Sequence, residues 1–84
     1  MNAPRGHPGV ILGELEAALR RRGLDGIYGA TAGGFGVLSV GRGLSVWCDG
    51  SVLWWILGGQ RVTWPAADTE GAAGELAKLA SGRP

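Results

Sequence analysis

Short runs rich in hydrophobic residues, separated by glycine-containing turns, make up the middle of this chain. Short runs rich in β-branched and aromatic residues and bounded by turn residues are typical of strands. Asp49-Gly50 and Gly58-Gly59 are both favoured sequences for two-residue hairpin turns. The pattern therefore predicts three antiparallel strands, over residues 44–48, 51–57 and 60–64.

The two turns also predict which residues lie opposite each other. About Asp49-Gly50 the pairs are Cys48 with Ser51, Trp47 with Val52, Val46 with Leu53, Ser45 with Trp54 and Leu44 with Trp55. About Gly58-Gly59 they are Leu57 with Gln60, Ile56 with Arg61, Trp55 with Val62, Trp54 with Thr63 and Leu53 with Trp64. Directly opposed residues share one face of a sheet, so these pairs divide the residues into two sets.

The two faces differ in character. The first, which we call the core face, holds enough apolar residues for a core: Leu44, Val46, Cys48, Leu53, Trp55, Leu57, Val62 and Trp64. The second, which we call the outer face, is mixed: Ser45, Trp47, Val52, Trp54, Ile56, Arg61 and Thr63. The outer face is too apolar to lie in water and too polar to form a second core. It is interpreted as a contact surface, on which Arg61 is expected to place its guanidinium over Trp54. The alternative is that a loop, the N-terminal tail or residues 24–34 fold over this face.

Helical periodicity appears at both ends of the chain. Apolar residues spaced by three and four predict a helix over roughly 9–22, after a flexible tail at 1–8. Gly23 and Leu24 follow it as expected for a Schellman cap that uses Leu19. A second helix is predicted after Asp68 as N-cap, with Thr69 and Glu70 in its first turn. Its apolar stripe is Ala72 or Ala73, Leu76, Leu79 and Ala80, and Gly71 and Gly74 are expected to permit close approach to the sheet.

Residues between the first helix and the three strands are harder to assign. Phe35–Val40 is predicted to be a strand, joined to the next by a three-residue turn at 41–43 that places Val40 opposite Leu44 and Leu38 opposite Val46 on the core face. The same register places Ser39 on the outer face, opposite Ser45. Residues 24–34 hold either a short edge strand near Ile27 and Tyr28 or a glycine-rich loop. Pro65 is expected to end the last strand because it cannot donate to the ladder. The sum is an α+β domain over 9–82, with a four-stranded antiparallel meander, or five strands if 24–34 contains one, and both helices on one sheet face.

Composition limits the function classes. A chain of 84 residues makes one domain, and its net charge of +1, from eight basic and seven acidic residues, predicts neither a polyanion-binding surface nor an acidic tail. The longest uninterrupted apolar run is Val52–Leu57, too short to span a membrane, and the N-terminus lacks the apolar run of a signal peptide. A cytoplasmic location is therefore expected, without membrane association.

Candidate catalytic chemistry is sparse. Cys48 is the only cysteine and is expected to be a small buried hydrophobe, while His7 lies in the tail. A cysteine nucleophile needs an activating base, and one cysteine with one histidine cannot complete a zinc site. The glycine-rich segments lack the Lys-Ser/Thr and the following helix of a phosphate-binding loop. The sequence therefore predicts no enzyme, no metal site and no cofactor.

One resemblance is carried by the segments Gly43–Gly50 and Trp64–Ala73. In these segments the chain resembles short uncharacterised proteins of actinomycetes. The resemblance implies a bacterial cytoplasmic origin and a small accessory or regulatory protein, and it implies no activity.

Two classes of function that involve binding remain. The favoured hypothesis is a protein–protein interaction or regulatory module, either a homodimer formed through the outer face or a domain that docks on a larger cytoplasmic protein. The alternative is a small ligand or a single-stranded nucleic acid bound on the same face. Nucleic acid is disfavoured because Arg42 and Arg61 are the only basic residues in the predicted sheet region.

Overall fold

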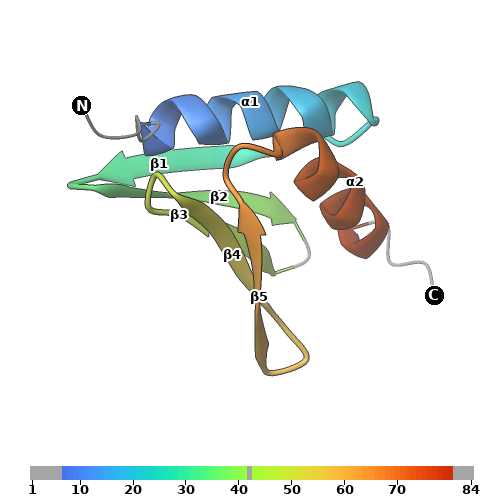
Figure 1. Ribbon diagram of the computed structural model, residues 1–84. Coiled ribbons are helices and arrows are strands. Elements are labelled where there is room, and N and C mark those ends of the chain that lie inside the picture. Colours follow the sequence, from blue (N-terminus) through green and yellow to red (C-terminus); the bar gives the residue numbers. More distant parts are fainter. Residues whose placement is uncertain (1–6, 42, 81–84) are drawn as a thin grey trace.

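The fold is a five-stranded antiparallel sheet with a helix at each end of the chain, as a computed structural model shows for residues 7–41 and 43–80 (Figure 1). The order is α1 (Pro8–Arg21), β1 (Tyr28–Ala32), β2 (Phe35–Gly41), β3 (Leu44–Cys48), β4 (Val52–Leu57), β5 (Gln60–Pro65) and α2 (Thr69–Ala80). The predicted α+β class is confirmed. Residues 24–34 contain a fifth strand, β1, which resolves the alternative between an edge strand and a loop.

Helix α1 ends with the cap that the sequence predicts. The amide of Leu24 donates to the carbonyl of Leu19 at 3.1 Å, and the amide of Gly23 donates to that of Arg20 at 3.0 Å. Gly23 has φ 93°, which glycine adopts without steric cost. The helix begins at Pro8, one residue before the predicted domain boundary. Residues 1–6 of the predicted tail and residues 81 and 82 of the predicted domain lie outside the described residues.

The sheet is a simple meander in which every strand pairs with its neighbours in sequence. All five pairs predicted about Gly58-Gly59 are present, from Leu57 with Gln60 to Leu53 with Trp64. Both glycines have positive φ, 60° and 82°, as a type I′ turn requires. Pro65 is the last residue of β5, as expected.

The predicted register between β3 and β4 is wrong by two positions. Trp47 lies opposite Trp54 and Cys48 opposite Leu53. The turn is centred on Gly50-Ser51, because the Asp49 carboxylate accepts the amides of Ser51 at 2.9 Å and Val52 at 3.1 Å. Gly50, with φ 96°, occupies the first central position, where a type II′ turn needs glycine. A shift of two leaves every side chain on its predicted face, since faces alternate with a period of two.

The connection between β2 and β3 contains a bulge. Leu38 lies opposite Val46 and Ser39 opposite Ser45, as predicted. The register then shifts, so that Leu44 faces Gly41 and not Val40. A bulge adds one residue to one strand of a pair, which the predicted three-residue turn did not allow for.

The core lies between the sheet and both helices, which cover the same sheet face (Figure 1). Leu15, Leu19, Val46, Leu53 and Trp55 are each 0% exposed, and Leu76 of α2 joins them. Helix α1 approaches the sheet closely at Gly36 of β2. A Cβ on Gly36 would stand 2.8 Å from Leu12 Cδ1 and 2.9 Å from Thr31 Cγ2, so a larger residue there would require these side chains to move.

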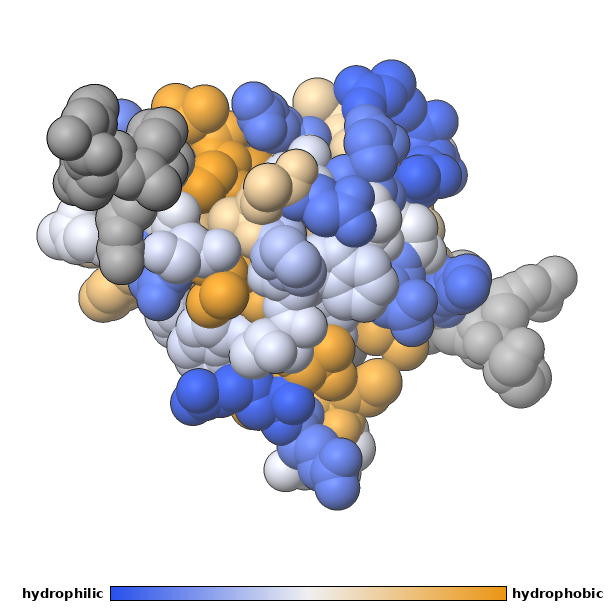
Figure 2. Space-filling view, in the orientation of Figure 1, coloured by the Kyte–Doolittle hydropathy of each residue, from blue (hydrophilic) through white to orange (hydrophobic). Residues whose placement is uncertain are grey.

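The end of the β4–β5 hairpin extends beyond the helices (Figure 1). Leu57, predicted to lie in the core, is therefore 46% exposed, while Val62 and Trp64 are only partly buried against the core. The faces are as predicted, but neither helix reaches the end of the hairpin. Hydrophobic surface remains open between α2 and this hairpin (Figure 2).

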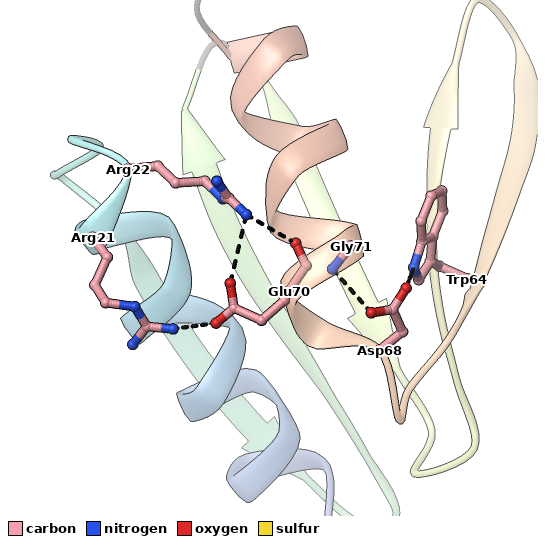
Figure 3. A network of polar contacts seen from close by, with 6 residues as sticks. All are labelled: Arg21, Arg22, Trp64, Asp68, Glu70 and Gly71. Atoms are coloured by element: carbon pink, nitrogen blue, oxygen red, sulfur yellow. Dashed lines mark hydrogen bonds and ion pairs between the residues drawn. The ribbon is translucent and has the colours of Figure 1, made fainter.

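Helix α2 is tied to both β5 and α1 at its N-terminus (Figure 3). Asp68 is the N-cap as predicted, accepting the Gly71 amide at 3.1 Å on one carboxylate oxygen and the Trp64 indole N–H at 3.0 Å on the other. From α1, Arg21 pairs with the Glu70 carboxylate, and Arg22 lies 3.5 Å from it. The arginines at the end of α1 therefore contact α2 as well as matching their own helix dipole.

The two glycines of α2 have a different role from the one expected. A Cβ on Gly71 would stand 2.1 Å from Asp68 Oδ2, and one on Gly74 would be nearest to the Arg22 guanidinium, at 3.7 Å. Neither glycine therefore serves close approach to the sheet. Gly71 makes room for the carboxylate that caps its own helix.

Within residues 7–41 and 43–80, no helix is long and apolar enough to cross a membrane.

Candidate functional site

Four side chains from four neighbouring strands stack across the outer face. Trp47 and Trp54, on β3 and β4, lie face to face, with ring centroids 5.5 Å apart and planes at 13°. Phe35 of β2 meets Trp47 edge-on at 6.1 Å. The Arg61 guanidinium of β5 lies 4.7 Å from the Trp54 ring centroid, as the sequence predicts. We call this row of side chains, Phe35, Trp47, Trp54 and Arg61, the aromatic ladder.

The ladder depends on the register shift between β3 and β4. Direct opposition of Trp47 and Trp54 brings their rings within stacking distance, whereas the predicted register would have placed Ser45 opposite Trp54. Stacked aromatic pairs contribute about 0.5–1.5 kcal/mol beyond the area they bury. Stacking therefore favours this arrangement of Trp47 and Trp54 in the isolated chain.

The remaining residues of the outer face surround this ladder. Ser45 and Val52 are partly buried, while Ile56, Arg61 and Thr63 are exposed. Ile56 is 52% exposed beside the hairpin end. All seven residues predicted for this face lie on it by strand register.

Two large residues of this face were missed by the sequence interpretation. Phe35 is 50% exposed and Tyr28 is 75% exposed, and Tyr28 pairs with Ser39 of the same face. The alternation of β2 carried the signal for Phe35, since Ser39 was assigned to the outer face and Phe35 lies four residues before it. Tyr28 lay in the stretch whose structure the sequence left open.

A shallow cavity of about 300 Å³ opens beside the ladder. Its lining residues are Phe35, Trp47, Cys48, Asp49 and Trp54. Asp49 and Arg61 are the only charged residues on the described part of the face, one of each sign. The described outer face is therefore aromatic and close to neutral, with its charges at its margins.

Coverage of this face by the chain itself was the alternative interpretation. Residues 28–32 are part of the sheet, and both helices lie on the core face. No segment of the described chain therefore covers the outer face. Residues 1–6, part of the predicted tail, lie outside the described residues.

Cys48 is buried, at 1% exposed, and accepts the Gly50 amide on its sulfur at 3.4 Å. Burial raises the pKa of its thiol, and the charge of Asp49 adds to this, against the opposing effect of the Gly50 hydrogen bond. A raised pKa keeps the thiol protonated and unreactive at neutral pH. In the described part of the chain, no three His, Cys, Asp or Glu residues are placed to hold a metal ion.

Comparisons with protein-family models, with curated proteins and with solved structures found no match for this chain.

Proposed function

We propose that the protein is a small non-enzymatic interaction module, acting as a regulatory or accessory protein in the bacterial cytoplasm, and that it forms a homodimer through its outer face. The observation that carries this proposal is the aromatic ladder on an uncovered sheet face. A protein–protein interface has an apolar, aromatic centre and a polar rim. Trp47 and Trp54 supply that centre, and Ser45, Thr63 and Arg61 lie around it.

A second copy suits this face for reasons of charge and symmetry. Two-fold pairing brings the same patch of both copies together, so a patch with a strong charge of one sign would repel itself. The described outer face carries Asp49 and Arg61, which are of opposite sign. A two-fold axis that lies in the plane of the face, midway between Asp49 and Arg61 and perpendicular to the line joining them, places Asp49 of each copy against Arg61 of the other.

The available area predicts the strength of this dimer. Five strands about 4.8 Å apart and about 17 Å long give a footprint of about 400 Å² per copy. A standard interface buries about 800 Å² per partner. The outer face alone is therefore expected to give a dimer that dissociates at micromolar concentration.

Two neighbouring residues of β4 provide a matched test. Ile56 on the outer face and Leu57 on the core face are 52% and 46% exposed at the same end of the strand. Ile56→Lys should prevent association through the outer face, whereas Leu57→Lys should not. The mass is measured by light scattering at concentrations from about 10 µM to about 1 mM, a range that spans the dissociation of a weak dimer. Equal loss of association in both variants, or in neither, would contradict the proposal.

The second candidate is a small ligand in the cavity beside the ladder. Its volume of about 300 Å³ is at the lower end for ligand sites. A single-stranded nucleic acid is less favoured, because Arg61 is the only basic residue on the described outer face. Titration of a nucleoside monophosphate into the wild-type protein, followed by the Trp47 and Trp54 indole N–H resonances, tests both ligands. Shifts confined to these two residues would favour the ligand over the homodimer.

A further inference from the structure

Strand β1 forms an edge of the sheet with unusual composition for an exposed edge. All five of its residues, Tyr28 to Ala32, are exposed, and none is charged or proline. The strand pairs with β2 over its whole length without a bulge. Natural sheets protect an exposed edge with charges, proline or bulges, because its unpaired N–H and C=O groups recruit another strand.

The opposite edge of the sheet is protected in that way. Strand β5 carries Arg61 at one end and Pro65 at the other. Proline cannot donate a ladder hydrogen bond, and a charge disfavours pairing with an identical strand. Within the described sheet, β1 is therefore the edge strand that lacks such protection and can pair with a strand of another molecule.

We propose that β1 is a second interface of this protein, which pairs antiparallel with β1 of another copy to form a continuous ten-stranded sheet. A two-fold axis at Ala30 is the register that pairs all five residues of the strand. It places Tyr28 opposite Ala32 of the second copy and Gly29 opposite Thr31. Each larger side chain then meets a smaller one, and no charges meet within the strand.

Helix α1 lies along β1 and fits this arrangement (Figure 1). It packs on β1, β2 and β3, with most of its sheet contacts on β2. Strand β2 would lie about 7 Å from the two-fold axis, so the two α1 helices would be about 14 Å apart. Closely packed helices lie about 8–10 Å apart, so strand pairing brings the two helices near each other without a clash.

The side of α1 toward this edge has two glycines, which permits such an approach. A Cβ on Gly9 would lie 3.5 Å from Thr31 Cγ2, and a cavity of about 230 Å³ opens between helix and strand. Its lining includes Gly9, Gly13 and Ala30, and also Glu16, whose charge is paired with Arg20. One strand residue spans about as much length as two helix residues. The axis at Ala30 therefore passes α1 between Gly9 and Gly13.

The edge contact is small. A strip about 17 Å long and about 10 Å high gives about 200 Å² per copy, so edge pairing alone is expected to be weak. Together with the outer-face dimer it gives a closed tetramer when the two perpendicular two-fold axes intersect. The edge pairing itself does not depend on the outer-face dimer.

Gly13 allows the edge to be tested without disturbing the monomer. Apart from its chain neighbours and the adjacent backbone of α1, no described atom lies within 4 Å of the position of a Cβ on Gly13, and lysine is a better helix former than glycine. Gly13→Lys places a charged side chain between the two α1 helices. Val10→Lys is the matched control, because Val10 is 59% exposed and lies about 100° around the helix from Gly9, whose Cβ position faces Thr31 of β1.

The experiment is performed in the Ile56→Lys background, which removes outer-face association. Light scattering at high micromolar to millimolar concentration should give the mass of two chains for Ile56→Lys and for Ile56→Lys with Val10→Lys. It should give one chain for Ile56→Lys with Gly13→Lys. Amide hydrogen exchange of β1 should slow at the higher concentrations only in the two associating variants.

The outcomes separate the two interfaces. A single-chain mass for Ile56→Lys at every concentration, with unchanged β1 exchange, would overturn edge pairing. So would a two-chain mass that persists with Gly13→Lys. If wild type and Ile56→Lys have the same two-chain mass, and Gly13→Lys removes it, edge pairing stands and the outer-face dimer does not.

Discussion

Replacement of Trp55 by alanine tests the division of the sheet into two faces. Trp55 is 0% exposed, and its ring stacks on Trp64 with centroids 6.1 Å apart. A buried tryptophan removes about 150–250 Å² from water, which corresponds to about 4–6 kcal/mol at 25 cal/mol per Å². Among the described residues its indole N–H has no hydrogen-bond partner, so its removal returns about 1–2 kcal/mol. We expect a net loss of about 3–5 kcal/mol.

The control is the neighbouring tryptophan on the other face. Trp54→Ala loses the stack on Trp47 and the contact with Arg61. Both contacts are partly exposed to solvent, so the expected cost is about 1–2 kcal/mol. A chain of 84 residues has a total stability of about 4–12 kcal/mol, so only Trp55→Ala threatens folding.

Urea unfolding followed by far-UV circular dichroism compares the two variants without depending on tryptophan fluorescence. Trp55→Phe adds a second check, because it removes the unpartnered N–H and keeps most of the ring. Its cost should be less than half that of Trp55→Ala. A larger cost for Trp54→Ala than for Trp55→Ala would refute the assignment of faces, since a one-residue slip exchanges them.

Two further predictions concern α2 and Cys48. Gly74→Ala should stabilise the protein by about 1 kcal/mol through helix propensity. Gly71→Ala should stabilise it less or destabilise it, because the new Cβ displaces the Asp68 carboxylate. Thermal melts compare the two variants, and equal gains in stability would contradict the role assigned to Gly71. Because burial raises the pKa of Cys48, its contribution to stability is fully present below the thiol's unfolded pKa and is lost as pH rises through the folded value. Wild type should therefore lose stability above about pH 9 relative to Cys48→Ala, and parallel pH profiles would contradict this.

Local sequence patterns predict most of the fold because the turns and caps are local. Gly58-Gly59 sets its hairpin register, and Gly23 with Leu24 ends α1, through backbone conformations that need glycine at those positions. The turn at 49–52 was mispredicted because two pairs of residues, Asp49-Gly50 and Gly50-Ser51, can both form its centre. Asp49-Gly50 suits a type I′ turn. The Asp49 carboxylate, however, accepts the backbone amides of Ser51 and Val52, which centres the turn on Gly50-Ser51.

The parts that alternation does not predict are tertiary. Leu57 alternates correctly onto the core face but lies beyond the reach of the helices, and no local pattern shows how far a helix covers a strand. The role of Gly71 likewise depends on an Asp68 carboxylate shared between the helix N-terminus and Trp64. For the outer face, alternation placed Trp47, Trp54 and Ile56 correctly despite the shifted register, because a shift of two preserves the face.

The central claim, that the outer face binds a second copy, is tested most directly by contacts between labelled and unlabelled chains. A mixed sample of isotope-labelled and unlabelled protein gives intermolecular nuclear Overhauser effects only between residues of different copies. We predict such effects between the aromatic rings of Phe35, Trp47 or Trp54 and the methyl groups of Ile56. A protein that stays monomeric at millimolar concentration, or intermolecular effects confined to α1 and β1, would contradict the claim.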